Sequence, residues 1–365
     1  MKTILTTLLL TLLPFSYTMS ENLTIWIGTG GIGSKGIYRT TLNTETGKLT
    51  EPVLAAEIGA PGFLALNTDK TRLYSLSKAD GGSVAVFSIG EDQSLNLLNS
   101  QAVGDGSASH LSLDKENKIL FTAQYGSGSV AAFPVAADGS IGKRTALINH
   151  SGSGPDKSRQ EAPHPHSATV SPDNRYLLVP DLGTDKIVIY EIDHATATLK
   201  EHGFGRAVPG SGPRHLKFSH DGSKVYVVNE MGMSITVFAY HAADGTMTPL
   251  QTIDTLPKDM WEIPNKAAEV RMHPSGKFVY ASNRGHDSIT AFSIDEKTGL
   301  LTFVEREAIR GAYPRNFHVD PTGQWLIAAG RASNTLSLFR IDQQTGGLLF
   351  TTDVLNVPDP ICLEY

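Results

Sequence analysis

The feature that most constrains the fold of this chain is a strand pattern that repeats along nearly its whole length. The pattern is a short alternating strand ending in an aromatic residue, and its six copies are SVAVF (83–87), SVAAF (129–133), KIVIY (186–190), SITVF (234–238), SITAF (288–292) and TLSLF (335–339). The last residues of successive copies are 46, 57, 48, 54 and 47 residues apart. A repeat of this length indicates an array of similar supersecondary units rather than one irregular domain.

Each repeat contains four strand patterns. A second strand pattern precedes the copy, as in KFVYASNR (277–284), and a first strand begins upstream behind a small residue or proline, as in PRHLKF (213–218). A glycine-containing turn and a further strand follow it, as in ADGTM (243–247). Four antiparallel strands per repeat are typical of a β-propeller blade. The predicted fold class is therefore all-β, with one blade per repeat.

The number of blades follows from the two ends of the chain. Six complete repeats run from Pro61 onward, while LTIWIGTG (23–30), KGIYRTTL (35–42) and a strand after TETGKL (44–49) supply three strands of a seventh. The missing first strand is predicted at PICLEY (360–365), where a new repeat would begin. We therefore predict a seven-bladed β-propeller that is closed by the C-terminal strand pairing in the N-terminal blade. Such closure removes the open edge of the array, so a monomer is expected.

The first 20 residues differ from the repeats. Lys2 supplies a positive charge, residues 4–13 are mostly apolar, and Thr18 and Ser20 are small residues suited to a cleavage site. This pattern predicts a secretory signal peptide at 1–20 and an exported, periplasmic protein; the alternative is a buried N-terminal strand. The apolar run is shorter than the roughly 20 residues that span a bilayer, so no membrane anchor is expected. Residues 21–365 are predicted to form one propeller domain.

Charge and cysteine content exclude several classes of function. The chain has 31 Lys plus Arg against 37 Asp plus Glu, a net charge of −6, whereas nucleic-acid binding usually requires a basic surplus. The single cysteine, Cys362, excludes an internal disulfide and a multi-thiolate metal site, and on the closing strand it is expected to be a small buried residue.

A glycine-rich string near the N-terminus resembles a nucleotide-binding motif. GTGGIG (28–33) matches the dinucleotide fingerprint, which functions only where a strand leads into a helix. A strand pattern follows here instead, so we interpret the string as a β-hairpin loop. No cofactor is expected.

The repeats also predict where a functional site lies. In an antiparallel blade the first strand starts on the face of the ring at which the second strand ends. Aligning the six complete blades places mostly polar residues at these positions. At the start of the first strand they are Gly62, Ser109, His166, Arg214, Ala268 and Arg315, followed by Phe63, His110, Ser167, His215, Glu269 and Asn316. At the end of the second strand they are Lys78, Tyr125, Leu182, Glu230, Arg284 and Arg331. Arginine offers a planar set of donors, so this face suits an anionic or polyhydroxylated ligand.

Other interpretations of these residues remain open. Each arginine at a strand end is either a ligand contact or a solvated surface charge. His164 and His166, in APHPHS (162–167), are either site residues or loop histidines with local partners. His110, His164 and His166 together offer an alternative zinc site, although no carboxylate recurs beside them at ligand spacing, so the predicted site contains no metal.

An ordered set of motifs resembles a known family. GPRHLKFSHDG (212–222), VYVVNEM (225–231), PHS (165–167) and ASNRGHDSI (281–289), with the count of seven blades, are similar to the seven-bladed lactonase family, which includes propeller-type 6-phosphogluconolactonases and fungal carboxymuconate lactonising enzymes. The resemblance covers essentially the whole chain after residue 20. It implies that His166, Arg214, Glu230 and Arg284 are the catalytic residues, and the register alignment places the same four on one face. His110, His215, Arg315 and Arg331 are then the expected substrate-binding residues.

The resemblance implies hydrolysis of a sugar-derived lactone. Arg214 and Arg284 would stabilise the oxyanion, and His166 or Glu230 would take the proton of the attacking water, with His166 favoured as base and Glu230 as its orienting partner. The predicted export favours an unphosphorylated lactone such as gluconolactone, while Arg315 and Arg331 keep 6-phosphogluconolactone open. The alternatives are a lactonising activity on a muconate-like acid, a ligand- or protein-binding propeller without catalysis, and a quinone-dependent redox propeller.

Overall fold

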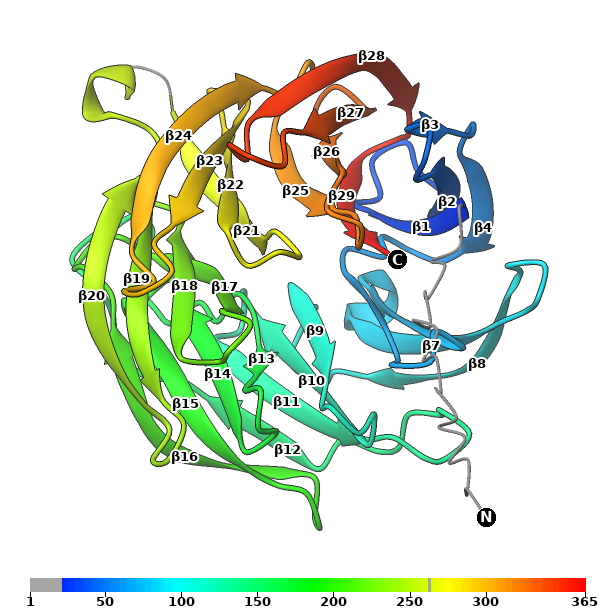
Figure 1. Ribbon diagram of the computed structural model, residues 1–365. Helices are drawn as coiled ribbons and strands as arrows, with labels where there is room; N and C mark the ends of the chain where they lie inside the picture. The colour runs from blue at the N-terminus through cyan, green and yellow to red at the C-terminus, as the bar shows by residue number, and fades with distance from the viewer. Residues whose placement is uncertain (1–21, 262–263) are drawn as a thin grey trace, which may run out of the picture.

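The chain folds into a ring of seven antiparallel β-sheets around a central axis (Figure 1). The computed structural model describes residues 22–261 and 264–365, so the predicted signal peptide lies outside the described residues. The seven-bladed propeller with four antiparallel strands per blade is confirmed. The described residues contain no helix with the length and apolar character that a membrane crossing requires.

The blades are numbered 1 to 7 along the chain. Blade 1 contains β1 (Asn22–Thr29), β2 (Gly36–Asn43), β3 (Lys48–Leu49), β4 (Val53–Glu57) and β29 (Pro360–Glu364). Blades 2 and 3 contain β5 (Leu64–Leu66), β6 (Arg72–Ser77), β7 (Ser83–Ile89) and β8 (Leu95–Ala102), then β9 (His110–Leu113), β10 (Ile119–Gln124), β11 (Ser129–Pro134) and β12 (Ala146–Asn149). Blades 4 and 5 contain β13 (Thr169–Val170), β14 (Tyr176–Asp181), β15 (Lys186–Asp193) and β16 (Thr198–Arg206), then β17 (Pro213–Phe218), β18 (Lys224–Asn229), β19 (Ser234–His241) and β20 (Thr246–Asp254). Blades 6 and 7 contain β21 (Lys266–Met272), β22 (Phe278–Arg284), β23 (Ser288–Ile294) and β24 (Leu301–Ala308), then β25 (Pro314–Val319), β26 (Trp325–Gly330), β27 (Thr335–Ile341) and β28 (Leu348–Asn356). Two short 3-10 helices are described, η1 (Ala79–Gly81) and η2 (Lys258–Met260).

The ring closes in blade 1 as predicted. The C-terminal strand β29 pairs antiparallel with β1, with Ile27 opposite Leu363 and Gly28 opposite Cys362. The outer part of this blade is divided, because β3 and β4 both pair with β2. The string at 28–33 joins β1 to its antiparallel partner β2, which confirms a hairpin loop in place of a nucleotide-binding turn.

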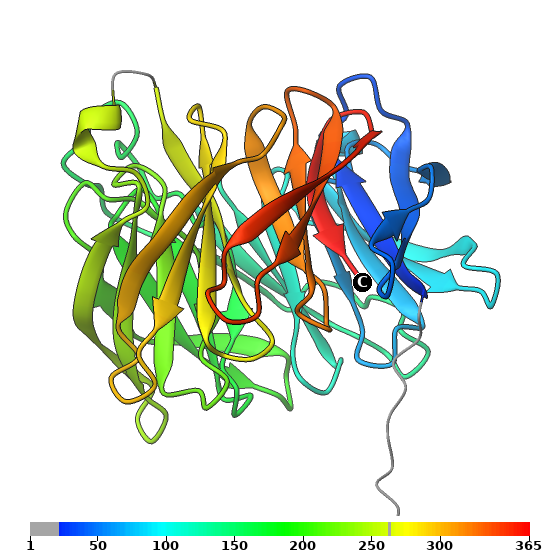
Figure 2. The ribbon, with the colours of Figure 1, turned by 45° about the horizontal axis from the view of Figure 1, so that its top comes forward.

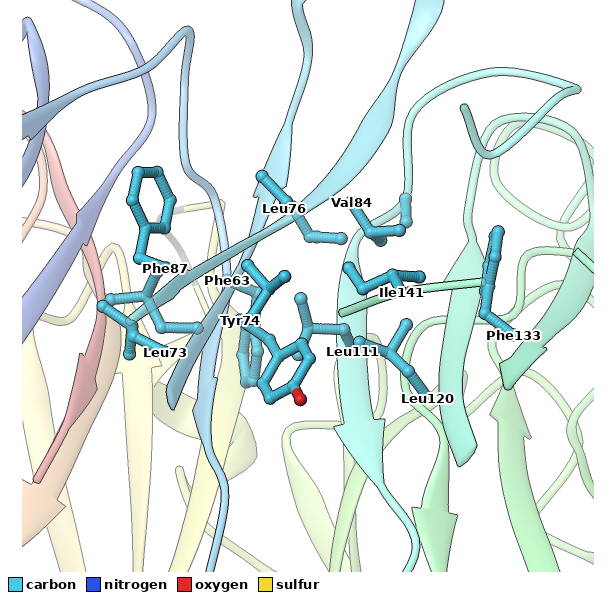
Figure 3. Close-up of a cluster of buried hydrophobic side chains, with 14 of the residues drawn as sticks. Phe63, Leu73, Tyr74, Leu76, Val84, Phe87, Leu111, Leu120, Phe133 and Ile141 are labelled. Carbon is cyan, nitrogen blue, oxygen red and sulfur yellow. The ribbon is translucent and has the colours of Figure 1, made fainter. Parts of the chain in front are cut away.

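The core lies between neighbouring blades. Successive side chains of a strand point to opposite faces, so each second strand contacts two neighbours. Val225 and Val227 of β18 pack with residues of blade 4, whereas Tyr226 and Val228 pack with residues of blade 6. Figure 3 shows part of a cluster that joins blades 2 and 3 and extends to blade 1; it includes Phe63, Tyr74, Leu111, Leu120 and Phe133. Burial on both faces explains the continuous apolar runs in these strands.

Buried aromatic residues also connect several blades to the next through hydrogen bonds. Tyr226 Oη donates to the carbonyl oxygen of Gly299 at 3.0 Å, and Tyr280 Oη donates to that of Gly346 at 2.9 Å. Trp325 Nε1 donates to the carbonyl oxygen of Thr44 at 2.8 Å, which joins blade 7 to blade 1. In each case the acceptor lies in an outer hairpin turn of the following blade, so these contacts fix the blades against one another.

The first strand of a blade is here called the inner strand, and in several blades it contains an irregularity where it begins. The pairing register shifts between Pro213 and His215 and again between Pro314 and Asn316, so Arg214 and Arg315 are bulge residues. A bulge turns its side chain away from the regular alternation of the strand. The inner strand predicted at 165–170 is regular only over Thr169–Val170, with one isolated bridge from Pro165 to Asp181, because the two prolines before His166 lack the N–H donors of a ladder.

Two connections between blades are longer than the others and lie on the side where the inner strands begin. Residues 150–168 join β12 to β13, and residues 255–265 join β20 to β21. They account for the wide spacings of 57 and 54 residues in the repeat. In Figure 2 the short helix η2 of the second connection lies at the upper side of the ring. We call this side of the ring the pocket face.

Candidate active site

A cavity of about 510 Å³ opens on the pocket face at the end of the central channel. Its walls come from most of the blades and from both the inner strands and the ends of the second strands. Its lining residues with ionisable side chains are Lys78, Asp105, Tyr125, Arg159, His166, Glu230, Lys266, Arg284 and Arg315. Apart from tyrosine and histidine, these are five cations and two carboxylates, which makes the cavity locally basic in an acidic protein.

Glu230 is the centre of the charged network. Its carboxylate accepts from Arg214 Nε at 3.1 Å and lies 2.8 Å from Arg284 Nη2, both through Oε2. The other oxygen, Oε1, accepts from Arg159 Nη2 at 2.7 Å. Glu230 is only 4% exposed, so one buried carboxylate binds three guanidinium groups. Glu230 therefore fixes the positions of the three guanidinium groups relative to one another.

Backbone contacts hold these charged residues in place. Glu230 follows β18, and its N–H donates to the carbonyl oxygen of Gly212 at 2.7 Å. Arg284 ends β22, and its Nη2 donates to the carbonyl oxygen of Ala267 at 2.8 Å. Arg214 occupies its bulge and donates from Nη1 to the carbonyl oxygen of Ala268 at 2.5 Å. Arg214 is only 1% exposed and does not line the cavity, so it supports Glu230 from beneath.

His166 lines the cavity beside this network. It is 3% exposed, and its Nδ1 is buried without a hydrogen-bond partner. Its ring lies edge-on to Tyr125, with centroids 5.5 Å apart, and near His215, with centroids 5.1 Å apart. Because Nδ1 is enclosed, Nε2 is the nitrogen available to a ligand in the cavity. No hydrogen bond joins His166 to Glu230 among the described residues, so no direct contact supports the role of orienting partner for Glu230.

The electrostatics separate the two candidate bases. Burial lowers the pKa of His166 well below 6.5, and the nearby Arg214 charge lowers it further. Burial alone would raise the pKa of Glu230, but the charges of Arg284 and Arg214 outweigh it and hold that pKa well below 4.5. At neutral pH the cavity therefore contains a neutral imidazole and a fixed carboxylate anion.

Arg159 is a site residue that the sequence reasoning missed. It lies in the long 150–168 connection, and its Nη2 contacts Tyr125 Oη at 3.2 Å as well as Glu230. The neighbouring Gln160 is fully buried and anchors this loop by donating from Nε2 to the carbonyl oxygen of Leu182 and to Asp185 Oδ1, each at 2.8 Å. The spacing of 57 residues was the available signal, since it marks an insertion on the pocket face.

The remaining predicted residues divide between the cavity and other places. Arg315 lines the cavity, and burial followed by the Arg284 charge lowers its pKa to about 10. Arg331 is near this region but is paired with Asp359, Nε to Oδ1 at 2.7 Å. His110 and His215 are buried deeper in the channel and do not line this cavity.

Two other residues weighed from the sequence have local partners. The His164 ring stacks on Tyr125 with centroids 4.4 Å apart, and its Nδ1 lies 2.8 Å from the Tyr125 carbonyl oxygen. Over residues 22–261 and 264–365, no three His, Cys, Asp or Glu side chains are arranged to hold a metal ion. Cys362 is fully buried, and burial raises the pKa of its thiol.

Comparisons with known proteins agree with this architecture. A family model described as "Lactonase, 7-bladed beta-propeller" matches residues 24–365. A 6-phosphogluconolactonase of Bacillus subtilis is 37% identical over 335 residues, covering 91% of this chain and 95% of the relative. A 6-phosphogluconolactonase of Formosa agariphila is 34% identical over 297 residues, covering 78% and 82%. The solved periplasmic gluconolactonase of Pseudomonas aeruginosa superposes with a TM-score of 0.90 at 30% identity, covering 94% and 98%. The chain belongs to the seven-bladed β-propeller lactonase family.

Proposed function

We propose that this protein hydrolyses the ring ester of a sugar-derived δ-lactone to the open aldonic acid, at the cavity on the pocket face. Family membership makes it a lactone-hydrolysing enzyme, a carboxylic-ester hydrolase. The observation that carries the proposed site is the binding of three guanidinium groups by Glu230 next to a neutral His166. This arrangement supplies a base and a cationic surface in one water-accessible cavity.

We assign the role of general base to His166. A base must be unprotonated and must reach the cavity, and the low pKa of His166 together with its buried Nδ1 leaves Nε2 free to accept a proton. Glu230 is a poorer base because three arginines stabilise its anionic form and occupy its oxygens. His166 would take a proton from the attacking water and later donate it to the ring oxygen when the C–O bond breaks.

The positive charge in the cavity would stabilise the transition state. Attack on the lactone carbonyl places negative charge on its oxygen, and preorganised donors at that position lower the barrier. Arg284 lines the cavity and is held by Glu230 and the Ala267 carbonyl group, so its orientation is set before substrate binds. Arg159 lies on the same carboxylate and is more exposed. We assign Arg284 to the oxyanion and Arg159 to the substrate as it enters.

Two substrates are supported by different observations. Lys78 and Arg315 line the cavity, and within the described chain no side-chain hydrogen bond or ion pair is formed by either. Two cations that form no ion pair among the described residues favour an anionic group, as in 6-phosphogluconolactone. The leader pattern at 1–20 favours an unphosphorylated lactone met outside the cytoplasm, and the Pseudomonas aeruginosa relative is named a periplasmic gluconolactonase.

A direct comparison of the two lactones tests the proposal. The purified protein is given glucono-δ-lactone and its 6-phosphate, and proton release is followed after subtraction of spontaneous hydrolysis. We expect acceleration of at least one lactone. An Arg315→Gln variant that raises KM for the phosphate but leaves KM for the plain lactone unchanged would assign the phosphate to the Lys78 and Arg315 side of the cavity. A folded protein that accelerates neither would contradict the proposal.

A further inference from the structure

Below the cavity, a buried chain of polar residues continues down the central channel from His166. His215 lies next along it and is 4% exposed, and its Nδ1 is 3.1 Å from Glu269 Oε2. Glu269 is 1% exposed and belongs to β21. These groups have no part in the chemistry proposed above, and their burial costs free energy unless hydrogen bonds compensate for the lost solvation.

Glu269 is held in one orientation. Its Oε2 accepts from Asn316 Nδ2 at 2.6 Å, and its Oε1 accepts from the backbone N–H of Val270 at 3.1 Å. Arg271 Nη2 lies 3.7 Å from the same Oε2. A carboxylate can only accept hydrogen bonds, so the contact with His215 requires the proton of that imidazole to be on Nδ1. Nε2 of His215 is then an acceptor.

His215 and His166 are neighbouring rings, and each has one buried nitrogen that forms no hydrogen bond in the structure. His215 Nε2 and His166 Nδ1 are both buried without a partner, and the two ring centroids are 5.1 Å apart. Buried polar atoms on neighbouring rings are normally satisfied by one another or by a water between them. An acceptor at His215 Nε2 stabilises a proton on His166 Nδ1, which leaves Nε2 of His166 unprotonated toward the cavity.

We propose that Glu269 and His215 are positioning residues that set the tautomer of His166 and so keep its Nε2 available as the base. This inference rests on the proposed role of His166. The chain Glu269, His215, His166 runs down the channel and approaches His166 from below, while Glu230 and its arginines act from the cavity side. The two sets of residues therefore have separate tasks: one orients the base and the other binds charge.

The charged groups around His166 and His215 determine how a substitution at position 215 should change the pKa of His166. His166 faces Arg214, His215, Arg315 and Glu230. His215 faces Arg214, His110, Lys217 and Arg271 besides its partner Glu269, and burial lowers its pKa well below 6.5. A neutral acceptor at position 215 favours the protonated form of His166, so its removal should lower the pKa of His166 and make it a weaker base.

The first test reads the tautomers directly and needs no turnover. Long-range ¹H–¹⁵N correlation spectra of the histidine-labelled protein distinguish Nδ1–H from Nε2–H in each ring. We expect Nδ1–H for both His215 and His166 at neutral pH. Observation of Nε2–H on His166 would overturn the proposal whether or not the protein hydrolyses lactones, so failure of this inference is distinguishable from failure of the proposed function.

The second test uses the His215→Phe variant, which keeps a ring but has no nitrogen. We expect kcat to fall roughly 10- to 100-fold, the range found when hydrogen-bond partners of metal-binding histidines are removed, with KM little changed. The acid limb of the kcat/KM profile should move to lower pH. His318→Gln is the control, since this β25 histidine contacts Tyr365 and the carbonyl oxygen of Val319 and, among the described residues, forms no hydrogen bond with Glu269, His215 or His166. An unchanged kcat, or a lower kcat with an unmoved acid limb, would show that position 215 has only a packing role.

A milder variant covers the case in which His215→Phe does not fold. Glu269→Gln keeps the shape of the side chain but removes the charge that fixes the His215 tautomer. Far-UV circular dichroism and the melting temperature establish folding first. A folded Glu269→Gln protein should show a smaller fall in kcat and the same direction of shift in the acid limb. Parental kinetics in this variant would overturn the role assigned to Glu269.

Discussion

The two mouths of the central channel have cavities of similar size but different charge. The pocket-face cavity has about 510 Å³ and five lining cations against two carboxylates. The cavity at the opposite mouth, hereafter the far mouth, has about 420 Å³ and three lining cations, Lys115, Lys217 and Arg271, against Asp114 and Glu364. Both are polar, so polarity alone does not identify the active site. The excess of positive charge at the pocket face supports the active site proposed there, because the transition state of ester hydrolysis is anionic.

The backbone differs between the two mouths in a way that explains this contrast. At the far mouth the inner strands lead into tight turns that are fixed by aspartates, as where Asp114 accepts from the N–H groups of Lys118 and Ile119. At the pocket face the inner strands begin with bulges at Arg214 and Arg315, and two long connections surround the opening. Variation in side chain and loop length is therefore concentrated at one end of a ring that the other end keeps regular.

Removing the proposed base should give the largest effect at the pocket face. His166→Gln cannot accept the proton of the attacking water, so kcat should fall by about 10²- to 10⁴-fold while KM changes little. Stopped-flow or pH-stat measurement of lactone hydrolysis provides the check. His318→Gln, a change of the same type in β25, should retain the parental rate. Retention of parental kcat by His166→Gln would exclude His166 as the base.

Removing the shared carboxylate should have the next largest effect. Glu230→Gln leaves three guanidinium groups without their common anion, so kcat/KM should fall by roughly 100-fold as Arg284 and Arg159 lose their orientation. Deleting one partner of a buried ion pair typically costs about 3–5 kcal/mol, so the melting temperature should also fall. A Glu230→Gln protein with parental kinetics would show that the arginines do not depend on this carboxylate.

Arg159 should affect binding more than the chemical step. It reaches Glu230 from a loop and is more exposed than Arg214 or Arg284, so Arg159→Gln is expected to raise KM by roughly 10-fold with a smaller change in kcat. Arg144→Gln is the matched control, because its Nη1 donates to the carbonyl oxygen of Val103 and the residue does not line the cavity. A fall in kcat without a change in KM would instead place Arg159 at the oxyanion.

The pH profile should be flat on the acid side of neutrality. A group whose pKa is lowered remains in its unprotonated form down to that lower pKa, and both His166 and Glu230 have lowered values. The kcat/KM of the parent protein should therefore change by less than about twofold between pH 7.5 and pH 6.5. A profile that falls with a midpoint near 6.5 would indicate a base with an ordinary imidazole pKa, in contradiction to the buried environment of His166.

The repeat predicted most of the fold because the same four-strand pattern recurs in the sequence of each complete blade. PRHLKF and PRNFHV match β17 and β25 residue for residue, and the register placed His166, Glu230, Arg284 and Arg315 around one cavity. The alignment predicted at which face of the ring each residue lies, but it did not predict how far along the channel the residue lies. It therefore grouped His110 and His215 with the residues that line the cavity. The 150–168 connection has no counterpart in the other blades with which it can be aligned, so the alignment did not predict Arg159 as a site residue. The three-way binding of Glu230 depends on side-chain geometry that periodicity does not encode.

The smallest effect on kcat/KM is expected for a substitution at the far mouth. A large effect there would contradict the assignment of catalysis to the pocket face. Burial and then the Arg271 charge lower the pKa of Lys217 to about 8, so its charged form is disfavoured where it lies. Lys217→Met should leave kcat/KM within about twofold of the parent, because no residue of the pocket-face cavity depends on it for a hydrogen bond or ion pair. The melting temperature should be unchanged or higher, since an apolar chain replaces a buried ammonium group. Arg315→Met makes a similar change at the pocket face, and there the loss of a cation should raise KM. If Lys217→Met instead lowered kcat/KM 10-fold or more, the positive charge of the whole channel, rather than of one mouth, would have to be assigned to catalysis.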